Sequence, residues 1–255
     1  MDDLRLPLTE HLAELRRRIV VILGVWAVGA AACWRFRDAI FGALLRPALD
    51  ALGPGGGQLQ AIAPTEIFFT YLKCSLLAGF VVTIPIFFWQ VWGFVAPGLY
   101  DREKRLALPF VLASTLLFVG GASFGYIVVF PVMFAFFTGF ESEFVRSAWT
   151  MREVFGFTTR LFLAFGISFE LPVVVFFLAS AGIVTAGQLL RGTPYAVLGI
   201  FILAATLTPP DWVSQIFLGV PMVALYLLGV GVAWVFGDRR RASETAEQAV
   251  GPPAG

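Results

Sequence analysis

Runs of residues without a charge constrain this chain more than any other feature of its sequence. A helix needs roughly 20 apolar residues to cross about 30 Å of hydrocarbon. Six runs approach or exceed that length, and one of them contains a single charge, Glu170. The chain is 58% hydrophobic and 14% charged, so most of its surface must face lipid rather than water. We therefore predict an all-α polytopic membrane protein with six transmembrane helices.

The same runs set the expected domain organisation. A single membrane domain is predicted over residues 1–238, and it begins with an amphipathic cytoplasmic segment over 1–17. The residues from 239 to 255 are rich in Ala, Glu, Gly and Pro and have little to bury, so we expect a disordered cytoplasmic tail there. The six spans are expected at about 18–36, 67–93, 106–135, 152–181, 193–208 and 212–236.

The fifth run is expected to give the shortest helix. Pro194 begins it and Pro209 ends it, and proline interrupts a helix because it lacks an amide hydrogen. About 14 residues remain for regular helix, which cover only about 21 Å. We therefore expect the fifth and sixth helices to form a short hairpin over which the bilayer thins.

The basic residues predict the orientation of the spans. Arg16, Arg17 and Arg18 crowd against the first span, and residues 239–241, which are all Arg, follow the sixth. Lys104 and its basic neighbours lie between the second and third spans, on the same side. The basic residues of the opposite side are spread through two long loops. Because cytoplasmic loops carry the excess of Lys and Arg, we expect both termini to be cytoplasmic.

Prolines inside the runs predict bent helices. They fall in four of the six runs, at Pro85, Pro131, Pro172 and Pro221. Each frees a backbone carbonyl and bends its helix. Bent helices do not pack as a straight bundle, so we expect a curved wall with a concave face.

Glu14 is the first polar candidate. Leu8, Leu12, Leu15 and Ile19 repeat at helical spacing, which is typical of an amphipathic helix that continues into the first span. The local sequence favours a pair of Glu14 with Arg17 or Arg18, which stabilises a helix by about 0.2 to 0.5 kcal/mol. By the same local reasoning, Glu103, in the loop between the second and third spans, is a solvated charge between Arg102 and Lys104.

Glu170 is the second candidate, because it is expected near the centre of the bilayer. A carboxylate there costs roughly 2.5 to 3.5 kcal/mol unless it is protonated, hydrated or paired. A function is its default explanation, and a structural bond to a neighbouring helix is the alternative.

The sequence lacks the parts of several enzyme classes. It has no glycine-rich phosphate loop, no serine with a membrane-embedded base and no paired aspartates. Its one histidine has no cluster of metal ligands around it. The net charge of +1 gives no argument for nucleic acid. We predict a protein that is not an enzyme and has no cofactor, metal site or nucleic-acid partner.

Four separated motifs resemble one family. They are residues 11–16 (HLAELR), residues 90–100 (QVWGFVAPGLY) with Glu103, residues 169–172 (FELP), and residues 207–211 (LTPPD) with Gln215. Together, in order and on the expected sides of the membrane, they are similar to TatC, the six-span receptor subunit of the twin-arginine protein translocase. The resemblance covers about residues 8 to 236.

The resemblance implies a cup-shaped fold and a role in transport. A member of this family binds signal peptides with paired arginines on folded cargo at the cytoplasmic face of a prokaryotic inner membrane. It works with the single-span subunits TatA and TatB and associates with itself, and the proton-motive force drives transport. Glu14 and Glu103 would bind the arginine pair, which reverses the local interpretation of both.

The resemblance also implies roles for other residues. Besides the two glutamates, the signal-peptide surface would include Leu15, Arg16, Phe94, Pro97, Tyr100 and Arg105. Contacts with partner subunits, or polar roles inside the membrane, would fall to Glu170, Thr208, Asp211 and Gln215. Pro47 and Phe68 would act on the outer side.

Two other functions remain as alternatives. A proton-coupled small-solute transporter would use Glu170 as its coupling carboxylate. A non-catalytic membrane scaffold would bind no twin-arginine peptide.

Overall fold

The computed structural model describes residues 8–52, 59–95, 107–142, 144, 148–180, 182–208 and 211–249. Nearly all of these residues are helical. The apolar helical stretches long enough to cross a membrane number six among the described residues. They are Leu12–Trp34, Pro64–Phe94, Leu108–Thr138, Met151–Ser180, Ala186–Leu207 and Trp212–Val235. The all-α, six-span prediction is therefore confirmed.

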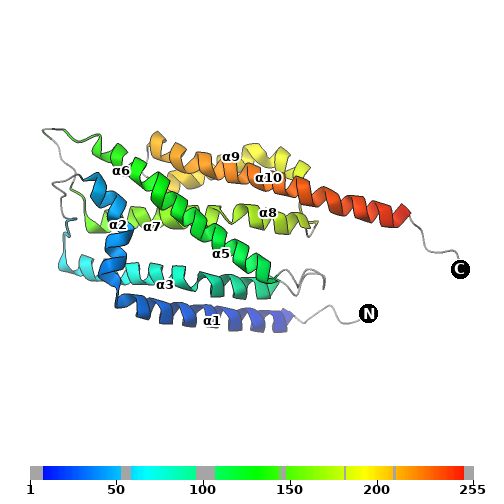
Figure 1. Ribbon diagram of the computed structural model, residues 1–255, viewed down its shortest axis with the longest axis horizontal. Helices are drawn as coiled ribbons and strands as arrows, with labels where there is room; N and C mark the ends of the chain where they lie inside the picture. Colours follow the sequence, from blue (N-terminus) through cyan, green and yellow to red (C-terminus); the bar gives the residue numbers. More distant parts are fainter. Residues whose placement is uncertain are drawn as a thin grey trace.

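The spans run along the long axis of the molecule, and α1 begins at the end where α10 finishes (Figure 1). A short helix, α2, lies across the opposite end. The elements in chain order are α1 (Leu8–Trp34), α2 (Arg37–Ala51), α3 (Pro64–Val95), α5 (Ala107–Phe124), η2 (Gly125–Val129), α6 (Phe130–Thr138), α7 (Met151–Ser168), α8 (Leu171–Ser180), α9 (Ala186–Leu207) and α10 (Trp212–Ala249).

Two of the four predicted proline sites coincide with interruptions of a span. Pro131 follows η2, a π-helical turn that separates α5 from α6. Pro172 follows the turn at Phe169 and Glu170 that separates α7 from α8. In each case the proline removes the amide that would continue the helical hydrogen bonds. Pro85 and Pro221 lie inside α3 and α10, which continue through them.

The fifth helix is longer than the sequence predicted. α9 begins at Ala186, ahead of Pro194, and spans 22 residues, or about 33 Å. A capping box forms its start, in which Thr185 and Gln188 each bond the other's backbone amide. Pro194 is tolerated inside the helix, and the expectation that it begins the helix was wrong. The helix is therefore long enough to cross the hydrocarbon.

The last helix also extends beyond its expected boundary. α10 continues to Ala249, past the position at 239 where the sequence predicted a disordered tail. Ala, Glu, Arg and Gln are strong helix formers, so a helix that is already nucleated in the membrane can propagate into this stretch.

The helices α1 and α3 pack closely against each other. A Cβ built on Gly79 would lie 2.4 Å from the backbone nitrogen of Ala30, so the two helices touch backbone to backbone. The Trp26 indole donates a hydrogen bond of 2.8 Å to the Leu76 carbonyl along the same contact. Small residues permit such close approach inside membranes. The pair positions the start of α1 beside the end of α3.

The helix α2 was not expected, because the sequence was interpreted as a loop between the first two spans. Leu45 and Ala48 on one face of α2 are completely buried, and Phe41 and Leu44 pack beside them. This face covers the main core, which is built around Phe130 and other residues of α6, α7, α9 and α10. An amphipathic stripe of this kind explains why the segment is helical although it does not span the membrane.

The segment before α3 is joined to the segment before α7 by hydrogen bonds. Gln60 pairs with Thr150 in a parallel bridge through the Gln60 amide to Trp149 (2.9 Å) and the Met151 amide to Gln60 (2.8 Å). The carboxylate of Glu66 accepts the Arg152 amide at 2.8 Å. Glu66 at the start of α3 thus caps the first turn of α7 from another helix.

Candidate functional site

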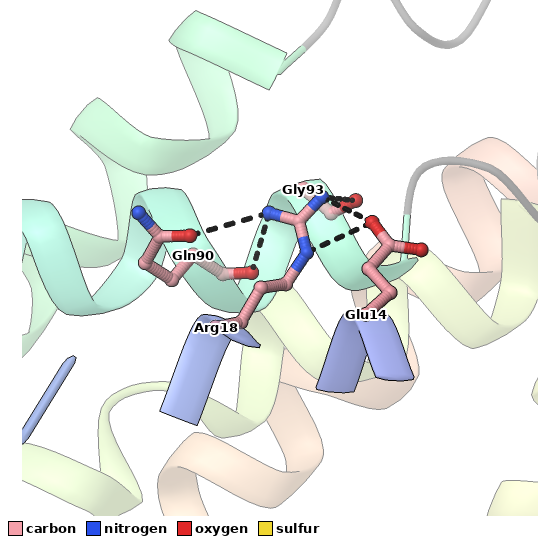
Figure 2. Close-up of polar contacts among 4 residues, drawn as sticks. All are labelled: Glu14, Arg18, Gln90 and Gly93. Carbon is pink, nitrogen blue, oxygen red and sulfur yellow. Dashed lines mark hydrogen bonds and ion pairs between the residues drawn. The ribbon is translucent and has the colours of Figure 1, made fainter. Parts of the chain in front are cut away.

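Glu14 lies in α1 and is held by Arg18 one turn further along. The Arg18 Nε and Nη2 atoms donate to the same oxygen of Glu14, at 3.0 and 2.5 Å (Figure 2). The Glu14 and Arg18 side chains are 29% and 23% exposed, so the pair is half-buried. The pairing of Glu14 with Arg18 that the local sequence favoured is therefore confirmed.

The guanidinium of Arg18 also contacts the last turns of α3. Its Nη2 donates to the Gly93 carbonyl at 2.8 Å, and its Nη1 lies 3.4 and 3.3 Å from the main-chain and side-chain oxygens of Gln90. Figure 2 shows the guanidinium with the oxygens of Gln90 on one side and the Glu14 carboxylate and the Gly93 carbonyl on the other. A single cation thus links Glu14 to α3.

A cavity of about 320 Å³ opens beside this pair. Its lining residues are Glu14, Arg17, Arg18, Val21 and Gln90. The cavity therefore offers a carboxylate, an amide and apolar surface to a ligand at the rim of the bundle, at the end where α1 begins.

Glu14 is the described residue of the predicted signal-peptide surface that lines this cavity. Leu15 and Phe94 are half-buried on α1 and α3, and Arg16 is exposed. The remaining predicted residues, Pro97, Tyr100, Glu103 and Arg105, lie outside the described residues. That Glu14 and Glu103 lie close together therefore stays a prediction.

Glu170 lies in the turn between α7 and α8 and is half-buried. It lines a second cavity, of about 210 Å³, whose walls are otherwise mainly apolar and include Phe88, Trp92 and Phe110. Within the described part of the chain, Glu170 Oε1 and Trp92 Nε1 are buried without a hydrogen bond. The cavity could accept a group that is mostly apolar and carries a donor and an acceptor.

The three polar candidates near the start of α10 have local hydrogen bonds. The buried Thr208 hydroxyl donates to the Ala204 carbonyl at 2.9 Å, and the Ser214 amide donates to the Asp211 carboxylate at 2.6 Å. Asp211 is therefore a helix cap, which gives it a structural role. Gln215 is half-buried, and its backbone amide donates to the backbone carbonyl of Asp211.

Pro47 and Phe68 both lie at the end of the molecule opposite the start of α1, in α2 and at the beginning of α3. Pro47 lies inside α2, where it deprives the Ala43 carbonyl of its helical partner, and the Tyr126 hydroxyl donates to that carbonyl instead. Phe68 is 54% exposed on α3, and its ring meets Trp34 edge-on at 5.9 Å.

These features define a multi-spanning α-helical membrane protein whose candidate site is an anchored carboxylate at one rim of the helical bundle. The family model described as Sec-independent protein translocase protein (TatC) matches residues 10–221. The chain belongs to the TatC family.

Relatives and solved structures support this membership. The chain is 42% identical over 243 residues to the Sec-independent protein translocase protein TatC of Desulforapulum autotrophicum, covering 95% of this chain and 90% of that protein. It is 40% identical to the TatC protein of Helicobacter pylori (strain 26695), over 89% of this chain and 87% of that one. The fold matches a crystal structure of the twin-arginine translocase receptor TatC with a TM-score of 0.79 and 32% identity, over 88% of this chain and 97% of the other.

Family membership decides between the functions left open above. This family is a non-enzymatic component of a protein transport system, so the chain is a component of the twin-arginine translocase. The alternatives of a proton-coupled solute transporter and a scaffold are therefore set aside.

The contribution of Gln90 and Gly93 to the site was not predicted from the sequence. Both residues belong to the motif at residues 90–100, but neither was predicted to bind Arg18. The sequence contains one signal for this contact, because Gly93 lies one turn before Pro97, and a carbonyl four residues before a proline has no helical donor.

Proposed function

We propose that this chain is the receptor of its translocase and binds signal peptides with paired arginines through Glu14 and Glu103 at the cytoplasmic face. The observation that carries the proposal is the Glu14 carboxylate, which lies beside an open cavity and already binds a guanidinium. Carboxylates bind guanidinium groups through charge-assisted, forked hydrogen bonds. The matching crystal structure is described as that of a twin-arginine translocase receptor, which agrees with this chemistry.

Two such contacts do not suffice for a receptor. Each charge-assisted hydrogen bond contributes about 1.5 to 3 kcal/mol, so a pair corresponds to dissociation constants from several millimolar to tens of micromolar. We infer that the apolar stretch of the signal peptide supplies additional contact. The apolar cavity lined by Trp92 and Phe110 is a candidate, because Trp92 precedes Gly93 directly in α3.

The proposed setting is the inner membrane of a prokaryote, with both termini in the cytoplasm. The start of α1 and the end of α10 at the same end of the molecule are consistent with this orientation (Figure 1). TatA and TatB type subunits are the proposed partners, with Thr208 and Gln215 at their contact, and the complex would also contain further copies of this chain. Transport is driven by the proton-motive force.

Photocrosslinking tests the proposed receptor function. A photoreactive twin-arginine peptide should crosslink to membranes that contain this chain, and the double variant Glu14→Ala plus Glu103→Ala should lose most of the product. A Lys-Lys version of the peptide is the control, since lysine lacks the planar fork of arginine. Equal crosslinking of the double variant and the unaltered chain would rule out the assignment of these two glutamates.

A further inference from the structure

Arg18 occupies a site with the chemistry of an arginine-binding pocket. Its guanidinium donates to the Glu14 carboxylate, to the carbonyls of Gln90 and Gly93, and to the Gln90 side chain (Figure 2). The acceptors come from two helices that are far apart in the sequence. This cradle, formed by Glu14, Gln90 and Gly93, matches the five donors of a guanidinium better than the three of an ammonium group.

The sequence explains why acceptors are available at the end of α3. Pro97 has no amide hydrogen, so it cannot supply the helical hydrogen bond that the Gly93 carbonyl would otherwise accept. Gly93 lacks a side chain, and a Cβ there would lie 2.3 Å from the Arg18 Nη1 atom. A cation is also favoured at the C-terminal end of a helix by the helix dipole.

We propose that Arg18 is a resident ligand of the Glu14 carboxylate, which a signal-peptide arginine displaces on binding. This inference rests on the proposed function. Displacement exchanges one guanidinium for another at Glu14, so an arginine that enters this site adds little net binding. Arg18 is thus an internal competitor that lowers the affinity of the site for arginine-bearing peptides.

The contacts of Arg18 permit the exchange. Both of its bonds to Glu14 fall on one carboxylate oxygen, so a guanidinium that takes this oxygen must replace both. Arg18 keeps the oxygens of Gln90 and Gly93 when it releases Glu14, so its charge does not lose every acceptor. The displaced group would remain against α3.

Charge around the cavity favours exchange over the addition of a further cation. Arg17 and Arg18 line the cavity with Glu14 as the carboxylate among its lining residues. A peptide with two more positive charges would meet a net positive wall while Arg18 stays in place. Release of Glu14 by Arg18 provides the incoming arginine with an anionic partner.

The test compares Arg18→Gln with Arg17→Gln in the full chain, reconstituted in lipid nanodiscs. Both variants remove one positive charge from the cavity wall, but no hydrogen bond or ion pair of Arg17 is recorded among the described residues. Binding of a fluorescent twin-arginine peptide and of a single-arginine peptide is measured by anisotropy. We expect Arg18→Gln to tighten the binding of both peptides about three- to tenfold, because the competitor for Glu14 is gone.

The matched variant separates competition from general electrostatics. Arg17→Gln should strengthen the binding of both peptides by a clearly smaller factor. Weaker binding by Arg18→Gln would show that Arg18 positions Glu14 and would overturn the proposal. So would unchanged binding, or equal effects of the two variants.

Two controls keep the result interpretable. Arg18→Lys retains the charge but lacks the fork, so it should also tighten the binding of both peptides if Arg18→Gln does not fold. Binding by the unaltered chain is measured first. If the unaltered chain fails to distinguish twin-arginine from twin-lysine peptides, the proposed function itself fails. If it does distinguish them and Arg18→Gln binds neither peptide more tightly, only the role of Arg18 is wrong.

Discussion

Carbonyl groups that a proline leaves without a helical donor are satisfied by side chains at both ends of this molecule. Pro47 frees the Ala43 carbonyl, which accepts the Tyr126 hydroxyl. Pro97 follows the Gly93 carbonyl by four residues, and that carbonyl accepts Arg18. Inside a membrane an unsatisfied carbonyl is costly, because no water replaces the lost bond. These prolines therefore create acceptors that tie separate segments of the chain together.

Gly93→Ala should lower the thermal stability of the protein. Alanine normally stabilises a helix by about 0.5 to 1 kcal/mol relative to glycine, but here its Cβ would overlap the Arg18 guanidinium at 2.3 Å. Arg18 must move, and its bonds to α3 and Glu14 weaken, so we expect a net loss of about 1 kcal/mol. The measurement is the melting temperature in detergent.

Gly24→Ala is the matched control for this substitution. A Cβ at Gly24 has no neighbour within 4 Å among the described residues, so its melting temperature should stay the same or rise. A Gly93→Ala variant that melts no lower than Gly24→Ala would contradict the proposed contact.

At the scale of elements, α1 and α3 form one unit, and α2 lies at the end of the bundle opposite the start of α1. Gly79 allows the backbones of α1 and α3 to touch, and Arg18 links the start of α1 to the end of α3. At the other end, α2 is joined to η2 by the bond from Tyr126. Glu14, Gln90 and Gly93 thus lie on packed helices and not on loops.

Gly79→Ala should separate α1 from α3. Its Cβ would lie 2.4 Å from the Ala30 backbone nitrogen, and backbone cannot move away as a side chain can. We expect a loss of about 1 to 3 kcal/mol or more, as for other overpacked sites. Chemical unfolding in mixed micelles measures it, with Gly120→Ala, whose Cβ would meet nothing within 4 Å among the described residues, as the control. Equal stability of the two variants would show that the helices are less close than the structure indicates.

A double-mutant cycle tests the link between Pro47 and Tyr126. Tyr126→Phe alone should cost about 0.5 to 1.5 kcal/mol, because the Ala43 carbonyl loses its donor. In a Pro47→Ala background the restored amide can bond Ala43, so the same change should cost clearly less. Unfolding free energies of the four proteins give the coupling. Additive effects would mean that Tyr126 does not compensate for the proline.

For the whole molecule, the proposed function requires one end of the bundle to face the cytoplasm. The site around Glu14 lies at the end where α1 begins and α10 finishes, whereas α2 lies at the other end (Figure 1). The proposed orientation therefore places the start of α1 and the end of α10 in the cytoplasm.

Labelling of introduced cysteines tests this orientation. Leu12→Cys lies near the Glu14 site and is 62% exposed in the unaltered protein, and Phe144→Cys lies at the outer end and is 94% exposed. In a background without Cys33 and Cys74, a membrane-impermeant maleimide added to intact cells should label Phe144→Cys only. Lysed cells, in which both should react, are the control. Labelling of Leu12→Cys in intact cells would place the signal-peptide site on the wrong side of the membrane.

Hydrophobic run length and motif spacing were enough to predict the six spans, the family and the pairing of Glu14 within α1. Each of these depends on local sequence: about 20 apolar residues form a span, and Glu14 and Arg18 are neighbours one helical turn apart. The position of Glu170 in a break before Pro172 follows from the same kind of local rule.

Only the tertiary structure decided which groups surround the Glu14–Arg18 pair. The acceptors on Gln90 and Gly93 are more than 70 residues away in sequence, and they meet Arg18 because Gly79 lets two helices pack at backbone distance. The helical state of α2 was likewise decided by its buried face. The start of α9 depends instead on a capping box, which is a local feature of the sequence at Thr185 and Gln188. Local rules determine which segments enter the membrane, since lipid acts on each segment separately. The contacts between segments depend on helix packing, which no single segment encodes.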